Sequence, residues 1–205
     1  MAGSSGPAAG IDMTLPKMTL CRQIFPRDAI SDPSSALASL IRSGWIREAI
    51  RPGQSIAITG GSRGIAAIVP LMKVLAAALR EMGGRPFVVN AMGSHGGATA
   101  AGQRALLSSL GLTEETLGCP VKVGMEVDAV GETAGGFPVL CDRNAAQADH
   151  IIVINRIKEH TAVTGPVQSG LCKLCAGGLG NVEQAARLHR YGPSRMGRIV
   201  QEVAM

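Results

Sequence analysis

The chain has 205 residues, a length that suits one sizeable domain and part of another. Hydrophobic residues make up 46% and charged residues 17%, which predicts a packed core and excludes a disordered chain. Aromatic residues are only 2%, so aliphatic side chains must fill that core. With no apolar run long enough for a membrane helix and no secretory leader pattern, we expect a cytoplasmic protein without a membrane partner.

The net charge of +5 is spread along the chain, and aromatic side chains for stacking on bases are scarce. Nucleic-acid binding usually needs a basic track or stacking aromatics, so we expect no nucleic-acid partner. A small anionic ligand is the better use of the positive charge. The five cysteines are an odd number, which argues against a disulfide framework.

Three units of the same kind follow one another in the chain, each an apolar strand, a Gly-rich or polar loop and a helix. The expected strands are 55–59, 86–92 and 151–155, and the first two are followed by helices at about 66–82 and 99–110. Strands that alternate with helices predict an α/β fold, with a Rossmann-like, mostly parallel sheet and helices on both faces. The loops then meet at the carboxyl edge of the sheet, where such folds bind ligands.

The remaining segments set the expected domain limits. Residues 1–15 are read as a loose terminus, 16–192 as the α/β domain, and 193–205 as a helix that Ser194 caps and that leads into a further, C-terminal domain. An earlier helix is expected from Asp32-Pro33 to about Ile50. Short strands are candidates at 121–125 and 137–140.

Three loop residues carry the chemistry expected at that edge: Arg63, His95 and His160. The guanidinium of Arg63 in a Gly-rich turn suits a carboxylate or phosphate. The alternative is that Arg63 is a solvated arginine on a surface turn. Imidazoles between small residues suit proton transfer, and the alternatives are a helix cap for His95 and a metal ligand for His160.

Lys173 lies among small and apolar residues, where desolvation makes a lysine nucleophilic; the alternative is a lysine that extends from its helix to solvent. Cys172 and Cys175 form one CxxC, a spacing used in redox and zinc sites but also found in buried packing. His189 lies on an expected amphipathic helix, where a surface histidine is the simplest interpretation.

The loop Thr59 to Ile65 resembles the TGxxxGIG loop of short-chain dehydrogenases. The rest of that pattern is missing: Ala66 replaces the last glycine, Asn90 stands where an acidic residue would hold a ribose, and Tyr191 is followed by Arg195 and not lysine. An NAD(P)-dependent dehydrogenase is therefore an alternative, and a non-catalytic module that binds an anion or nucleotide is another.

Taken together, the motifs resemble the nickel-dependent lactate racemase family, whose members carry a nickel-pincer nucleotide. The matching elements, in chain order, are Ser62-Arg63, Gly93-Ser94-His95, Asn155 to His160, Ser169 to Lys173, and His189. The resemblance runs from about residue 15 to the end of the chain.

The resemblance implies a role for each residue. Lys173 would hold the cofactor covalently and His189 would bind its nickel. His95 and His160 would be acid/base groups on opposite faces of the substrate, and Arg63 would hold the substrate carboxylate.

The resemblance also assigns loop residues to cofactor binding, namely Gly61, Ser62, Gly93 and Ser94. The implied activity is that of an isomerase, a racemase or epimerase of a lactate-like or polyol 2-hydroxy acid, with cofactor-synthesis enzymes as partners. The family has an acidic residue three positions before the arginine, and this chain has Gly60 there. That difference bears on the substrate more than on the cofactor.

Overall fold

The computed structural model describes residues 17–25, 28–62, 64–160 and 167–205. The chain divides into two units, Met1–Ile30 and Ser31–Met205. The described part of the first unit contains no helix or strand and is exposed. The fold below is therefore that of the second unit.

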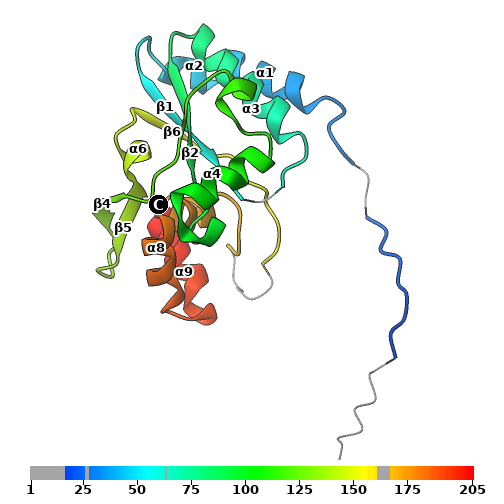
Figure 1. Ribbon diagram of the computed structural model, residues 1–205, viewed down its shortest axis with the longest axis vertical. Coiled ribbons are helices and arrows are strands. Elements are labelled where there is room, and N and C mark those ends of the chain that lie inside the picture. Colours follow the sequence, from blue (N-terminus) through cyan, green and yellow to red (C-terminus); the bar gives the residue numbers. More distant parts are fainter. Residues whose placement is uncertain (1–16, 26–27, 63, 161–166) are drawn as a thin grey trace, which may run out of the picture. The chain divides into compact units, whose positions relative to one another are not determined.

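The second unit is built on a parallel sheet with the strand order β3-β2-β1-β6 (Figure 1). Its strands are β1 (Ser55–Gly60), β2 (Arg85–Asn90), β3 (Val121–Lys122) and β6 (His150–Ile152). The register of the central pair places Ile58 beside Val88 and Gly60 beside Asn90, so the two strands end level with each other. The α/β fold with a parallel sheet that the sequence predicts is confirmed.

Helices fill most of the chain between and after the strands. They are α1 (Pro33–Ser43), α2 (Trp45–Ala49), α3 (Ile68–Glu81), the 3-10 turn η1 (Gly96–Ala98), α4 (Ala100–Ser109), α5 (Glu114–Leu117), α6 (Arg143–Ala146), α7 (Leu171–Lys173), the π-helix η2 (Leu174–Gly178), α8 (Asn181–His189) and α9 (Pro193–Ala204). None of the described helices is long and apolar enough to span a membrane.

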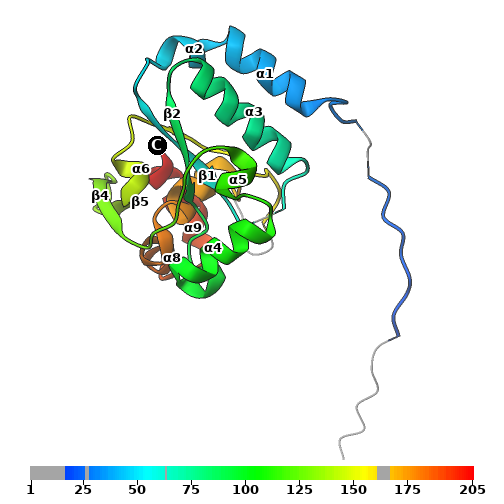
Figure 2. The same cartoon turned by 45° about the horizontal axis from the view of Figure 1, so that its top comes forward.

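Alternate residues of the central strands enter two separate cores, one on each face of the sheet. Ile56, Ile58 and Val88 pack with buried residues of α1, α3, α4 and α5. Ala57 and Val89 pack with α6 and η2 on the other face. Since neighbouring side chains of a strand point to opposite faces, both faces need helical cover. Figure 2 shows α1 and α3 side by side in the first of these layers.

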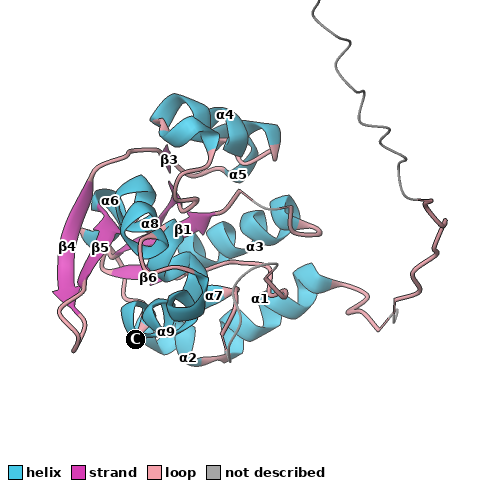
Figure 3. Cartoon of the chain, turned by 90° about the horizontal axis from the view of Figure 1, so that it is seen from below, coloured by secondary structure: helices cyan, strands magenta, loops and turns pink. Residues whose placement is uncertain are grey.

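A third core joins the last two helices to the hairpin of β4 (Val127–Glu132) and β5 (Pro138–Asp142). Phe137 packs there with Leu188 of α8 and Met196 and Val200 of α9. β4 and β5 are antiparallel and form a sheet of their own. Figure 3 shows this pair on the side of the unit away from α1 and α3.

Two helix predictions need correction. The helix expected from Pro33 to about Ile50 is two helices, because Gly44 ends α1 in an extended conformation and its N–H donates to Leu40 O at 3.0 Å. A Cβ at Gly44 would lie 2.7 Å from that oxygen, so the break depends on glycine. The last helix is capped by Gly192, with Pro193 in its first turn, and not by Ser194.

The region 112–149 also differs from expectation. The strand candidate 121–125 contracts to Val121–Lys122, and the candidate 137–140 becomes β5, which pairs with a strand that the sequence did not predict. That strand, β4, is largely exposed and has an irregularity between Ala129 and Gly131. It shows neither an apolar run nor clean alternation, the two patterns that identify strands in a sequence.

Candidate active site

A pocket opens at the carboxyl edge of the sheet, with a cavity of about 190 Å³. The loops after β1, β2 and β6 line it together with η2, α8 and α9. Among its lining residues are eight that the sequence assigns to the site: Gly61, Ser62, Gly93, Ser94, His95, His160, Lys173 and His189. Arg63, the ninth, lies outside the described residues. Segments up to 139 residues apart in sequence thus meet in one cavity, counting from Gly61 to Val200.

The loop after β2 is pressed against the π-helix. Gly93 has φ +58°, and its N–H donates to Gly178 O at 3.2 Å. A Cβ at Gly93 would lie 2.8 Å from Gly177 O, and one at Gly178 would lie 2.8 Å from Ala91 O. The two backbones can approach this closely only because both positions are glycine. This contact fixes the start of the Ser94-His95 loop relative to η2.

The loop after β6 is held by polar contacts between its outgoing and returning halves. Asn155 Nδ2 donates to Gly170 O at 2.7 Å, and His160 N donates to Gln168 Oε1 at 3.1 Å. Between these two contacts, Ser169 hydrogen-bonds Lys158. The sequence predicts no role for Asn155 or Ser169 beyond their place in the motifs. Both are pocket residues that brace the segment carrying His160.

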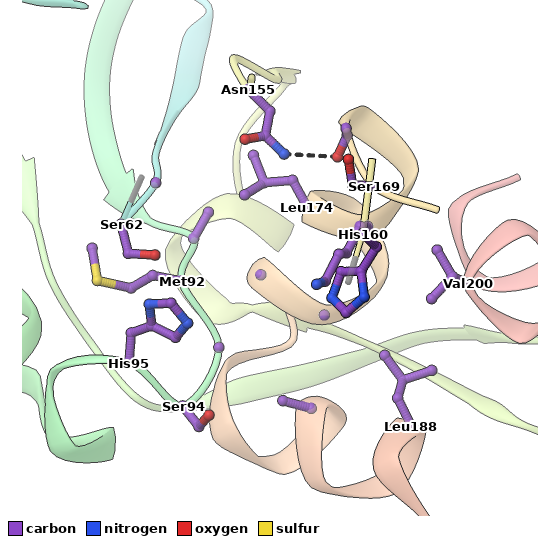
Figure 4. A pocket seen from close by; sticks show the side chains of 18 of the residues that line it. Ser62, Met92, Ser94, His95, Asn155, His160, Ser169, Leu174, Leu188 and Val200 are labelled. Carbon is purple, nitrogen blue, oxygen red and sulfur yellow. Dashed lines mark hydrogen bonds between the residues drawn. The ribbon is translucent and has the colours of Figure 1, made fainter. Parts of the chain in front are cut away.

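Figure 4 shows how the two histidines lie in the pocket. His95 lies with Met92 and Ser94 on one side, and His160 lies near Ser169 on the other. Both rings line the same cavity, one from the β2 loop and one from the β6 loop. A small molecule between them would meet an imidazole from either side.

Lys173 ends the single turn α7 and is followed directly by the π-helix η2. Gly170, at φ +84°, starts this turn, and Leu174 contributes to the buried core beneath the sheet. π-Helical turns are rare and are found mostly at functional sites. The segment around Lys173 is therefore a short α-turn with a π-helical continuation, and Lys173 lines the pocket from it.

His189 is the last residue of α8, the amphipathic helix that the sequence predicts. Its neighbour Leu188 is buried in the third core, whereas His189 itself is exposed at the pocket. The described residues contain no group of three or more His, Cys, Asp or Glu side chains placed to hold a metal ion.

The cysteines next to Lys173 are packing residues. Cys172 packs against the third core, and neither it nor Cys175 is in a disulfide. Burial, with Cys172 as a smaller contributor, raises the pKa of Cys175. Burial likewise raises the pKa of Cys141 to about 11. Burial of this kind is typical of a thiol with low reactivity, which disfavours the redox alternative at Cys175.

The Gly-rich loop after β1 does not enter a helix as a dinucleotide-binding loop does. The helix α3 begins at Ile68, and its cap Ala67 has φ +57° and no side-chain hydrogen bond. The helix thus starts two residues later than the expected Ala66, after a turn in which Ile68 N donates to Ile65 O. Phosphate binding by this motif requires a helix N-terminus directly behind the glycines. The structure therefore weakens the dehydrogenase alternative.

Comparison with known proteins gives one family. Residues 14–181 match the model of the lactate racemase N-terminal domain, a span that includes the pocket residues from Gly61 to Lys173. His189 lies beyond the matched span. No curated protein sequence matches this chain.

Proposed function

This chain belongs to the family of lactate racemase N-terminal domains, and from that premise we propose that it carries the cofactor and the acid/base residues of a nickel-pincer-nucleotide racemase or epimerase of 2-hydroxy acids. One observation carries the proposal. The loops after β2 and β6, which lie on either side of β1 in the sheet, and the helices that follow bring His95, His160, Lys173 and His189 to a single cavity.

The pocket residues suit such a cofactor in two ways. The nitrogen donors of the pocket, which include the amine of Lys173 and the imidazoles, come from different elements, and such a set would suit a metal that is carried by an organic cofactor. In addition, Gly61 and Gly177 leave bare backbone on the wall, and a Cβ at either would have no heavy atom closer than 3.6 Å. A planar ring system can lie flat on such a surface.

The proposal gives each residue a task. Lys173 holds the cofactor through its amine, an imidazole nitrogen of His189 completes the nickel coordination, and Gly61, Ser62, Gly93 and Ser94 contact the nucleotide. When bound, the nickel-pincer nucleotide supplies a reversible hydride acceptor. Arg63 holds the substrate carboxylate, which is the task of a guanidinium with two parallel donors.

His95 and His160 handle the proton of the substrate hydroxyl. A neutral imidazole accepts that proton, and an imidazolium on the other side returns a proton to the same oxygen. Racemisation in both directions requires a base for each enantiomer, so two imidazoles on opposite sides of the cavity are the arrangement that the reaction needs. The proposed substrates are 2-hydroxy acids, either lactate-like acids or polyol acids.

Intact mass and nickel content test the proposal. The full-length protein is produced together with the cofactor-synthesis enzymes, beside Lys173→Ala and the matched variant Lys158→Ala, which removes another lysine from the same pocket. We expect a covalent mass increase and equimolar nickel in the wild type and in Lys158→Ala, and neither in Lys173→Ala. An unmodified, nickel-free wild type from a host shown to make the cofactor contradicts the proposal and leaves a non-catalytic anion-binding module.

A further inference from the structure

A buried side-chain amide lies directly behind the loop that carries His95. Gln103, on α4, is fully buried. Its Nε2 donates to Gly93 O at 2.8 Å and to His95 O at 3.2 Å. These two carbonyls flank Ser94, so a single amide group fixes the peptide planes on both sides of the pocket-lining pair Ser94-His95.

The orientation of the Gln103 amide is set by a chain of further buried groups. Asn90 Nδ2 donates to Gln103 Oε1 at 2.6 Å and to Asn181 Oδ1 at 2.9 Å. Asn181 Nδ2 in turn donates to Asp142 Oδ2 at 3.2 Å. Asn90 Oδ1 accepts from Gly124 N at 3.0 Å, so Asn90 must present its NH₂ group to Gln103, and the Gln103 amide is thereby oriented. At the end of the chain, the NH₂ group of Gln103 has to face the His95 loop.

We propose that Gln103 is the positioning residue for His95, and this inference rests on the function proposed above for that histidine. All four members of the chain, Gln103, Asn90, Asn181 and Asp142, are fully buried, so no bulk water replaces a lost hydrogen bond. Without the Gln103 NH₂ group, the buried Gly93 O would lose this donor and His95 O would keep the one from Ala98 N, so the loop would shift to reach other donors. The His95 ring would move with it.

The chain offers a matched control in Gln184 on α8. This side chain is also fully buried and also bridges two backbone groups: Nε2 donates to Pro138 O at 3.1 Å, and Oε1 accepts from Leu140 N at 3.3 Å. Gln184 therefore holds β5 and not the His95 loop. The substitutions Gln103→Met and Gln184→Met remove equivalent interactions at equal burial, and only the first touches the pocket loop.

The deciding experiment uses the full chain without cofactor. The protein has four histidines, so each ring signal in an NMR spectrum can be assigned by substitution. We expect Gln103→Met to shift the ring signals of His95, and Gln184→Met to leave them in place. His150, which contacts Gln54 at 3.0 Å near the start of β6, is the internal reference in both spectra. An unmoved His95 in Gln103→Met, or equal shifts in both variants, overturns the inference whether or not the protein binds a nickel cofactor.

A kinetic measurement on the nickel-loaded enzyme adds a second readout. We expect kcat to fall about 100-fold in Gln103→Met, the loss typical of a small misplacement of a reacting group. In Gln103→Glu, the new carboxyl faces two carbonyls and has a raised pKa, so below that pKa it keeps a proton and one hydrogen bond to the loop. The kcat of Gln103→Glu should lie between those of the wild type and Gln103→Met, and it should fall further as the pH rises. A kcat for Gln103→Met equal to that of Gln184→Met contradicts positioning.

Discussion

At the scale of single residues, the proposal makes His95 and His160 acid/base groups and leaves His150 without a role in the reaction. His150 begins β6, at the end of the strand away from the pocket, and hydrogen-bonds Gln54. The three histidines thus share a residue type but not a place. This difference allows substitutions that separate catalysis from general effects of losing an imidazole.

We expect His95→Gln and His160→Gln each to lower kcat by roughly 10²- to 10⁴-fold, the usual contribution of a positioned acid or base. His150→Gln should retain the wild-type kcat. The measurement is the rate of interconversion of 2-hydroxy acid enantiomers by chiral chromatography, at equal nickel content for all variants. A nickel-loaded His95→Gln variant with wild-type turnover would remove His95 from the mechanism.

The sequence identifies residues with reactive side chains but not those that support them. His95, His160, Lys173 and His189 follow strand ends or lie on a helix in a fixed order, so both the motifs and the topology place them. Gln103 lies on a helix at a position where glutamine is usually exposed, and only the structure shows its burial. In the sequence, Asn90 stands out only because a dehydrogenase would have an acidic residue there. In the structure, it joins Gln103 to Asn181.

At the scale of elements, glycines decide how closely the loops approach one another. Gly93 needs both a positive φ and an absent side chain, since a Cβ would lie 2.8 Å from Gly177 O. Gly53, at φ +84°, needs only the backbone freedom, because nothing lies within 4 Å of its Cβ position. Substitutions at Gly53 and Gly93 therefore separate the effect of backbone strain on stability from the effect of the contact between the loop and η2.

We expect Gly53→Ala to lower the free energy of unfolding by about 1 to 2 kcal/mol, the cost of a left-handed conformation for a residue with a Cβ. Gly93→Ala should lower it by more, because the clash with backbone oxygen adds to that cost. Urea unfolding followed by circular dichroism measures both. Equal losses would mean that the close approach of the loop and η2 contributes nothing to stability.

Among the elements, those that bury an apolar face were predictable and those held by other contacts were not. β1 and β2 are read from their apolar runs, and α8 from its periodicity. The third expected strand, 151–155, is only His150–Ile152 in the structure, and none of its residues is buried. β4 cannot be predicted from its own sequence, because its side chains are largely exposed and its strand conformation depends on pairing with β5. The break between α1 and α2 at Gly44 is not predicted either, since one glycine does not by itself end a helix.

At the scale of the whole second unit, a buried polar chain connects the sheet to the last helices. It begins at Asp142, at the end of β5, passes through Asn181 of α8 and Asn90 of β2, and ends at Gln103 of α4. Burial, partly offset by the hydrogen bond from Asn181, raises the pKa of Asp142. The connection is thus anchored on a carboxyl whose charged form is disfavoured.

Asp149 gives the opposite case at the amino edge of the sheet. Its Oδ2 accepts hydrogen bonds from Ser55 Oγ and Ser55 N, both at 2.7 Å, and these bonds lower the pKa of Asp149. The charged form is favoured here, because the folded protein supplies donors that the unfolded chain lacks. Folding therefore shifts the pKa values of these two aspartate carboxyls in opposite directions.

These signs predict opposite pH dependences. For Asp142, the folded protein holds the proton more tightly than the unfolded chain, so its contribution to stability decreases as the pH rises from the ordinary value of 3.8 through the raised pKa. For Asp149, stability is fully present above 3.8 and is lost as the pH falls through the lowered pKa. Relative to Asp142→Asn, the wild type should lose stability with rising pH; relative to Asp149→Asn, it should gain stability. Urea unfolding across the acid range measures both differences, and slopes of the same sign would show that the hydrogen bonds to Asp142 outweigh the effect of burial on its pKa.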